Sequence, residues 1–114
     1  MRQETISELR GALEDTGIVA ELISLYLEDA PRQVESIKAA VMEGDAERLA
    51  LAAHTLKGSS AQLGAEELSE LCSELENIAL DGRAESASLL IDQLESTLAD
   101  ACTVFQSHYQ SLCP

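Results

Sequence analysis

One short segment of the sequence, AAHTLKGSSAQLGA at residues 52–65, places a histidine, a lysine and a glycine close together. The neutral imidazole of His54 is an available nucleophile near neutral pH, and the ammonium group of Lys57 attracts anions. On a helix, Lys57 and Gly58 lie about one turn from His54, so the three positions are neighbours on the helix surface. Together these residue types suit the handling of a phosphoryl group.

The apolar residues around this segment fix the direction in which His54 points. Leu49, Ala53, Leu56 and Leu63 recur at helical spacing and predict the buried stripe of an amphipathic helix. At about 100° per residue, His54 lies roughly 140° from the centre of that stripe. We therefore expect its side chain to face solvent.

Small residues surround His54 on the predicted outer face. Ala50, Gly58 and Ala61 lie one or two turns from it, and a glycine within a helix costs roughly 1 kcal/mol relative to alanine. Because this clearing does not favour folding, we interpret it as a docking surface, with Gly58 giving a partner access to His54. Leu51 falls beside the clearing and adds an exposed apolar contact, so Ala50, Leu51 and Ala61 are the candidate docking residues.

Helix signals recur along the whole chain, and strand signals do not. Thr5 and Glu8 form a capping box for a short first helix, and Asp45 is a candidate N-cap. Pro31 predicts a kink or a break near Asp29–Pro31. The expected helices cover residues 5–16, 18–42, 46–63, 66–80 and 86–112. The predicted fold is all-α: an antiparallel four-helix bundle with a short additional N-terminal helix, as a single domain over residues 1–114.

Each expected helix has an apolar stripe that predicts its buried side. The inward positions of the second and later helices are Ile18, Leu22, Leu25, Tyr26, Val34, Ile37, Val41, Leu68, Leu71, Cys72, Leu75, Ile78, Ala79, Ala87, Leu90, Ile91, Leu94, Leu98, Ala101, Phe105, Tyr109 and Leu112. Ser60 also lies on an inward stripe. These positions predict one continuous core.

Composition and charge exclude several classes of partner. With 21 acidic and 7 basic residues, the 114-residue chain carries a formal charge of −14, which repels nucleic acid and anionic membranes. No signal peptide or membrane-spanning run is evident. Three widely spaced cysteines argue against a disulfide framework and favour a reducing compartment. We expect a cytoplasmic monomer that contacts neither nucleic acid nor membrane.

The segment His54–Ser60, HTLKGSS, resembles the H-x-L-K-G-S-S motif of histidine-containing phosphotransfer (HPt) domains of bacterial phosphorelays. Ala53 before it and Leu63–Ala65 after it extend the resemblance. The segments Leu27–Pro31 and Leu75–Glu76 are also similar to parts of that family, so the resemblance covers about residues 18–80. Tyr26 stands where the family often has phenylalanine.

The resemblance implies a relay intermediate that takes a phosphoryl group from the aspartyl phosphate of one receiver domain and passes it to the aspartate of another. By the same resemblance, His54 is the phospho-acceptor, Lys57 the cation beside the phosphate, and Gly58 the point of access. The partners would be response-regulator receiver domains, with a hybrid sensor histidine kinase as a further candidate. No cofactor is expected on this chain, because Mg²⁺ would be bound by the receiver.

Kinase activity is not expected, because the sequence has no G-x-x-x-x-G-K-[ST] loop for a nucleotide. Two other interpretations stay open. A metal-binding bundle could use His54, His108 and the cysteines, although no pair has the spacing of metal ligands on one helix. A helical interaction scaffold without phosphotransfer could bind a partner helix through the face around Leu51.

Overall fold

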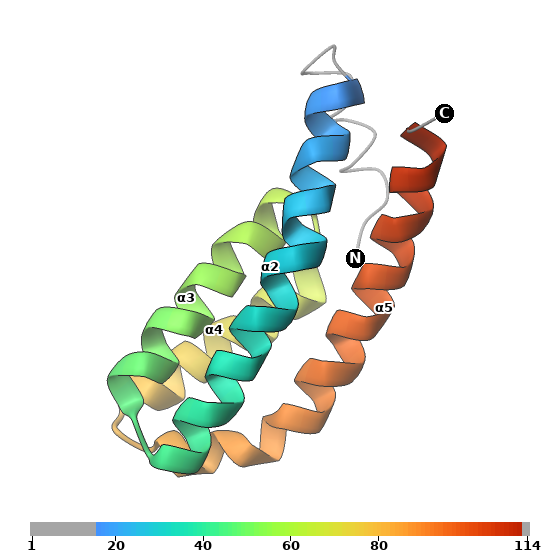
Figure 1. Cartoon of the computed structure of the whole chain (residues 1–114). Coiled ribbons are helices and arrows are strands. Elements are labelled where there is room, and N and C mark those ends of the chain that lie inside the picture. Colours follow the sequence, from blue (N-terminus) through green and yellow to red (C-terminus); the bar gives the residue numbers. More distant parts are fainter. Residues whose placement is uncertain (1–15, 113–114) are drawn as a thin grey trace.

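The computed structural model describes residues 16–112, which form four long α-helices and one short 3-10 helix, without a strand in that range. The α-helices are α2 (Thr16–Glu43), α3 (Ala46–Gln62), α4 (Glu66–Leu80) and α5 (Ser88–Leu112), and the 3-10 helix is η1 (Ala84–Ala87). Successive α-helices run in opposite directions and form the predicted antiparallel all-α bundle (Figure 1). The short helix predicted from Thr5 lies outside the described residues.

The turns between the helices have the residues that their backbone conformations require. Gly44, between α2 and α3, has φ of 67°, and Gly64, between α3 and α4, has φ of 82°, a region that other residues rarely adopt. The Asp45 carboxylate accepts a hydrogen bond from the backbone N–H of Arg48 at 3.1 Å, which caps the start of α3. The predicted N-cap at Asp45 and the predicted end at Gly64 are confirmed.

Helix α2 continues through Pro31, so of the kink or break predicted near Asp29–Pro31 the break does not occur. Pro31 is exposed, and water can therefore serve the backbone carbonyl that loses its helical partner. Tyr26 before the proline and Val34 after it both belong to the same hydrophobic core. Packing thus holds the two halves of the helix together despite the lost hydrogen bond.

The core lies between the four helices and confirms most of the predicted stripes. Leu49, Leu56, Leu75, Leu94 and Phe105 are fully buried in it. Two predicted inward residues of α2 are exposed instead: Ile18 and Leu25, the latter at 56%. Each precedes a buried residue, Val19 or Tyr26, and adjacent helix positions point about 100° apart, so only one of each pair faces inward. Helix α5 begins at Ser88, after η1, rather than at residue 86.

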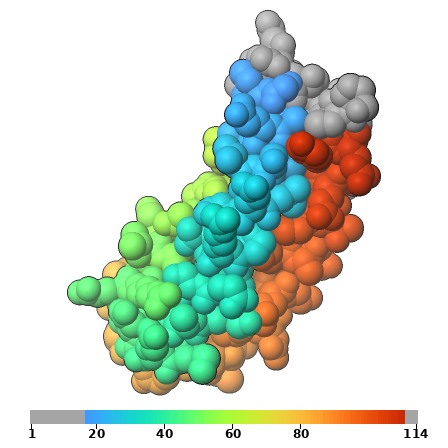
Figure 2. All heavy atoms as spheres, in the orientation of Figure 1, coloured from blue at the N-terminus to red at the C-terminus, as the bar shows by residue number. Residues whose placement is uncertain are grey.

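Helix α2 covers one face of the molecule, where it lies between α3 and α5 (Figure 2). The Lys38 ammonium on α2 donates to the Glu95 carboxylate on α5 at 3.2 Å and links the two helices. Helices α3 and α4 pack against each other beside α2 (Figure 1). The segment with His54, Lys57 and Gly58 lies within α3. Within residues 16–112, no helix is long and apolar enough to cross a membrane.

Candidate functional site

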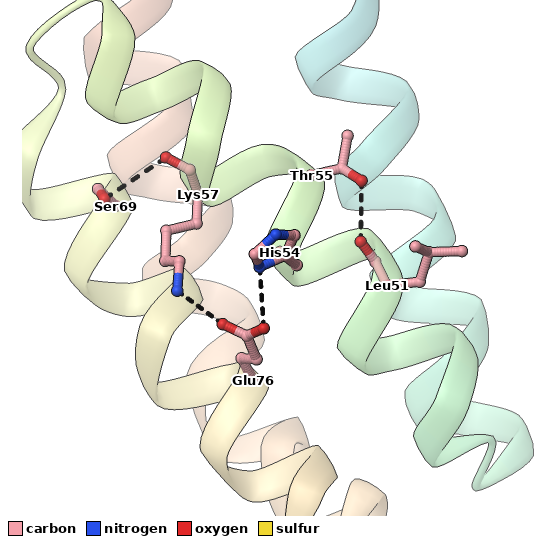
Figure 3. Close-up of polar contacts among 6 residues, drawn as sticks. All are labelled: Leu51, His54, Thr55, Lys57, Ser69 and Glu76. Carbon is pink, nitrogen blue, oxygen red and sulfur yellow. Dashed lines mark hydrogen bonds and ion pairs between the residues drawn. The ribbon is translucent and has the colours of Figure 1, made fainter.

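The imidazole of His54 lies near the middle of α3 and points away from the core, with 67% of its side chain exposed. Its Nδ1 atom lies 3.0 Å from Oε2 of Glu76, which projects from the neighbouring helix α4 (Figure 3). Neither Tyr26 nor another core residue is in hydrogen-bond contact with the ring. The side chain is therefore held at one nitrogen and exposed elsewhere.

The carboxylate of Glu76 lies between His54 and Lys57 and contacts both (Figure 3). Its Oε1 atom accepts a hydrogen bond from Nζ of Lys57 at 2.7 Å. This hydrogen bond is the main cause that lowers the pKa of Glu76 below its ordinary value, with further help from the charges of Lys57 and His54 and against the effect of partial burial. Glu76 is therefore an ionised carboxylate at neutral pH, and such a group can only accept hydrogen bonds.

Lys57 leans along the surface toward α4 rather than out into solvent. Its side chain is 32% exposed, and that of Glu76 is 20% exposed, so their ion pair is partly shielded from water. Charged pairs in such positions hold their geometry better than pairs between two fully solvated side chains. Lys57 thus lies near His54 as predicted, but the ammonium group of Lys57 is already paired with Glu76.

The small residues predicted around His54 differ in their exposure. Gly58 and Ala61 are exposed, whereas Ala50 is partly buried against the core. A Cβ atom placed on Gly58 would meet nothing within 4 Å, so the fold does not require glycine at this position. Leu51 is 69% exposed and lies, with Thr55, on the side of α3 that faces α2 (Figure 3).

The opposite side of α3 is anchored in the core by a buried hydrogen bond. The hydroxyl groups of Ser60 and Tyr26 lie 2.7 Å apart, and the Tyr26 ring packs edge-on against Phe105 at 5.2 Å between ring centroids. Burial raises the pKa of the Tyr26 phenol well above its ordinary range, so this group stays protonated. The pair joins α2, α3 and α5 beneath the exposed face that carries His54.

Sequence reasoning missed the contact between Glu76 and His54, although it singled out Leu75–Glu76 as a similar segment. Buried Leu75 could have placed α4 against α3, but side-chain reach across two helices is not visible in a linear pattern. The metal-binding alternative gains no support in the described part of the chain, where no group of three His, Cys, Asp or Glu side chains could hold a metal ion.

The fold and this surface define a class of protein: an all-α bundle with an exposed imidazole in the middle of one helix. The family model of the Hpt domain matches residues 21–104, well over half of the chain. The chain therefore belongs to the Hpt domain family. Its role is accordingly phosphotransfer in phosphorelays, and proteins of this family are phosphotransfer intermediates, not kinases, that interact with receiver domains and kinases.

A solved structure extends the comparison to nearly the whole chain. The crystal structure of histidine-containing phosphotransfer protein B (HptB) from Pseudomonas aeruginosa PAO1 matches with a TM-score of 0.88 and 31% sequence identity. The match covers 97% of this chain and 95% of the HptB chain, so the two share the same fold. A comparison with curated protein sequences finds no match.

Proposed function

We propose that His54 accepts a phosphoryl group from the aspartyl phosphate of one receiver domain and passes it to the aspartate of another. The observation that carries this proposal is the exposed imidazole of His54 with its Nδ1 atom held by the Glu76 carboxylate. A relay intermediate needs one nucleophile that a large partner can reach from solvent, and this histidine meets that requirement.

The contact with Glu76 supports different roles for the two nitrogens of His54. Because an ionised carboxylate only accepts, the proton of their 3.0 Å hydrogen bond is on Nδ1. In the neutral ring the lone pair is then on Nε2, the nitrogen that Glu76 does not hold. Glu76 is thus a positioning residue, which fixes the tautomer and orientation of the ring, and Nε2 is the nucleophile.

Transfer to His54 requires no proton movement on this chain. The Nε2 lone pair attacks phosphorus in line, the N–P bond forms, and the P–O bond to the receiver aspartate breaks. The aspartate leaves as a carboxylate with the electron pair of that bond. The ring retains its proton on Nδ1, and the positive charge that develops on it is stabilised by Glu76. Delivery to a second receiver reverses these steps.

The remaining groups act through charge and access. Lys57, one helical turn from His54, provides a positive charge near the phosphoryl oxygens. Gly58 leaves space for the receiver beside the imidazole, because no side chain projects from that position. We propose that this chain needs no cofactor of its own, that the receiver binds the Mg²⁺, and that the chain works as a monomer with receivers and a hybrid kinase as partners.

The direct test is incubation of the chain with receiver domains carrying labelled aspartyl phosphate. The native chain should gain acid-labile label, and His54→Gln should gain none while keeping its helical circular dichroism and melting temperature. His108→Gln is the matched control, since it removes the other histidine of the sequence, which is partly buried on α5.

Label on the native chain and on His108→Gln, but not on His54→Gln, would support the proposal. Label that persists in His54→Gln would contradict it. Receiver binding without any transfer of label would instead favour the non-catalytic scaffold, and loss of helical structure in His54→Gln would mean that the side chain supports the fold.

A further inference from the structure

A cleft of about 400 Å³ lies between α2 and α3, next to the face that carries His54. Its apolar part is formed by Leu22, the exposed side chain of Leu25 and the ring of Tyr26. Ser59 and Gln62 border it on α3, and Arg32 borders it on α2. The cleft therefore combines exposed apolar surface with a charged group at its edge.

The position of this cleft relative to His54 puts it within reach of a docked protein. Ser59 and Gln62 lie about 7 and 12 Å beyond His54 along α3, at ~1.5 Å per residue. A partner that binds with a surface of ordinary size covers about 800 Å², a patch on the order of 30 Å across. A receiver that reaches His54 and extends toward α2 therefore covers the cleft. On the α4 side, by contrast, Lys57 and Glu76 already satisfy each other.

Arg32 differs from the other basic side chains in the described range. Lys38, Arg48, Lys57 and Arg83 each form an ion pair with a carboxylate of the chain. Arg32 alone among the lysines and arginines of residues 16–112 takes part in no ion pair or side-chain hydrogen bond. In a chain of net charge −14, an arginine without a carboxylate partner is open to one from another molecule.

The acidic neighbours of Arg32 limit what the cleft can bind. Glu28 and Asp29 also line it, and their charges oppose a polyanion or a cluster of carboxylates. A single carboxylate that pairs directly with the guanidinium group of Arg32 can offset this repulsion. The apolar lining by Leu22 and Leu25 favours an occupant with an apolar side chain next to that carboxylate.

We propose that the α2–α3 cleft selects among receiver domains by binding an apolar side chain of the receiver, accompanied by one carboxylate that pairs with Arg32. This inference rests on the proposed function, because the occupant is the receiver that delivers or takes the phosphoryl group at His54. The cleft determines affinity and partner choice, and the imidazole carries out the transfer. The two roles are therefore separable by mutation.

The experiment measures dissociation constants for a panel of purified, unphosphorylated receiver domains by titration calorimetry, at low and at high salt. For the receiver that binds the native chain most tightly, Arg32→Glu should weaken binding by about tenfold or more, since it places like charges together. The salt dependence of binding should also decrease. Arg83→Glu is the matched control: it makes the same change of charge at an exposed arginine in the turn after α4.

A second pair of variants tests the apolar part of the cleft. Leu25→Ser should weaken the same receiver, whereas Leu89→Ser, at an exposed leucine near the start of α5, should not. With receiver at saturating concentration, Arg32→Glu and Leu25→Ser should still transfer label to His54 at the native rate. A change confined to the dissociation constant separates docking from chemistry.

Unchanged dissociation constants for Arg32→Glu and Leu25→Ser would overturn the proposal, as would equal losses in Arg83→Glu and Leu89→Ser. A panel in which no receiver binds the native chain would also overturn it. The predicted binding pattern without transfer of label to the native chain would uphold the cleft and contradict the function proposed for His54.

Discussion

The inward and outward faces of α3 differ in burial: the inward face belongs to the core, and the outward face carries the exposed His54. Leu56 and Ser60 on the inward face are fully buried, and Ser60 bonds to Tyr26 in the core. His54 and Gly58 on the outward face are exposed. Because a single helix carries both faces, substitutions on α3 should affect either stability or phosphotransfer, depending on the side they occupy.

The outward face itself has two different flanks. Toward α4, Glu76 contacts both Lys57 and His54 (Figure 3). Toward α2, Ser59 and Gln62 border an open cleft that is also lined by Arg32. In our proposal the first arrangement orients the imidazole of His54, and the second contacts the receiver. If the inward face and the two flanks of the outward face are independent, a substitution in one should leave the properties of the others unchanged.

The largest effect on stability is expected from the inward face. Leu56→Ala should lower the free energy of unfolding by about 2–5 kcal/mol, because it truncates a fully buried side chain and leaves a cavity in its place. Urea unfolding followed by circular dichroism measures the change. The fraction that stays folded should transfer phosphoryl groups at the native rate. A decrease in the free energy of unfolding below about 1 kcal/mol would show that the core tolerates poor packing at this face.

Gly58→Glu should have the opposite pattern, with a large effect on transfer and almost none on stability. A glutamate there adds bulk and negative charge where the receiver's acidic, phosphate-bearing pocket approaches, and like charges across an interface cost several kcal/mol. We expect transfer to fall about a hundredfold. The melting temperature should rise slightly, since any side chain fits and glycine is a poor helix former.

Gly58→Ala is the control for the helix propensity of this position. It should raise stability by up to about 1 kcal/mol and reduce transfer much less than Gly58→Glu does. Native transfer rates in Gly58→Glu would refute the role of Gly58 in giving access to His54.

Lys57→Ala should reduce the rate of phosphoryl transfer by less than Gly58→Glu does, with only a small loss of stability from the broken ion pair with Glu76. Its charge acts at a partly exposed site, where one such contact is worth roughly 1 kcal/mol, so transfer should slow by about tenfold at most. Receiver affinity should change less than in Leu51→Glu, which alters an exposed apolar contact. Lys38→Ala is the matched control, because Lys38 is similarly exposed and also ion-paired, but to Glu95. The opposite order of affinities would mean that Lys57 docks the receiver.

The smallest expected effect is a dependence of stability on pH through Glu76. Its pKa in the folded protein is lowered, so its ion pair stabilises the fold at neutral pH and down to the ordinary glutamate value of about 4.3. This contribution is lost as the pH falls further, through the lowered pKa. Glu76→Gln should therefore be less stable than the native chain at pH 7, and the difference should shrink in acid. A difference independent of pH would argue against an ionised Glu76.

Much of the fold follows from local sequence signals. Asp45 caps α3, Gly64 ends it, and α4 covers the predicted residues 66–80, because capping and positive-φ turns depend on residues close in the chain. The exposure of His54 and the burial of Ser60 also follow from the period of one helix. The roles assigned to His54, Lys57 and Gly58 stay predictions.

The features that could not be predicted depend on contacts between helices. Leu25 has the spacing of a buried residue, but the position of α3 leaves it at the edge of a cleft. Pro31 removes one hydrogen bond, and only the packing of both halves of α2 shows why the helix continues. The hydrogen bond between His54 and Glu76 joins residues 22 positions apart, and the rotation of α4 against α3 determines it.

The most direct test of the account is the identification of the phosphorylated atom by NMR of the isotopically labelled native chain after transfer from a receiver. We predict one phosphorylated residue, His54, with the N–P bond at Nε2, because the ionised Glu76 carboxylate can only accept a hydrogen bond and so favours the proton on Nδ1. Phosphate on Nδ1 of His54, on His108 or on a carboxylate would contradict it.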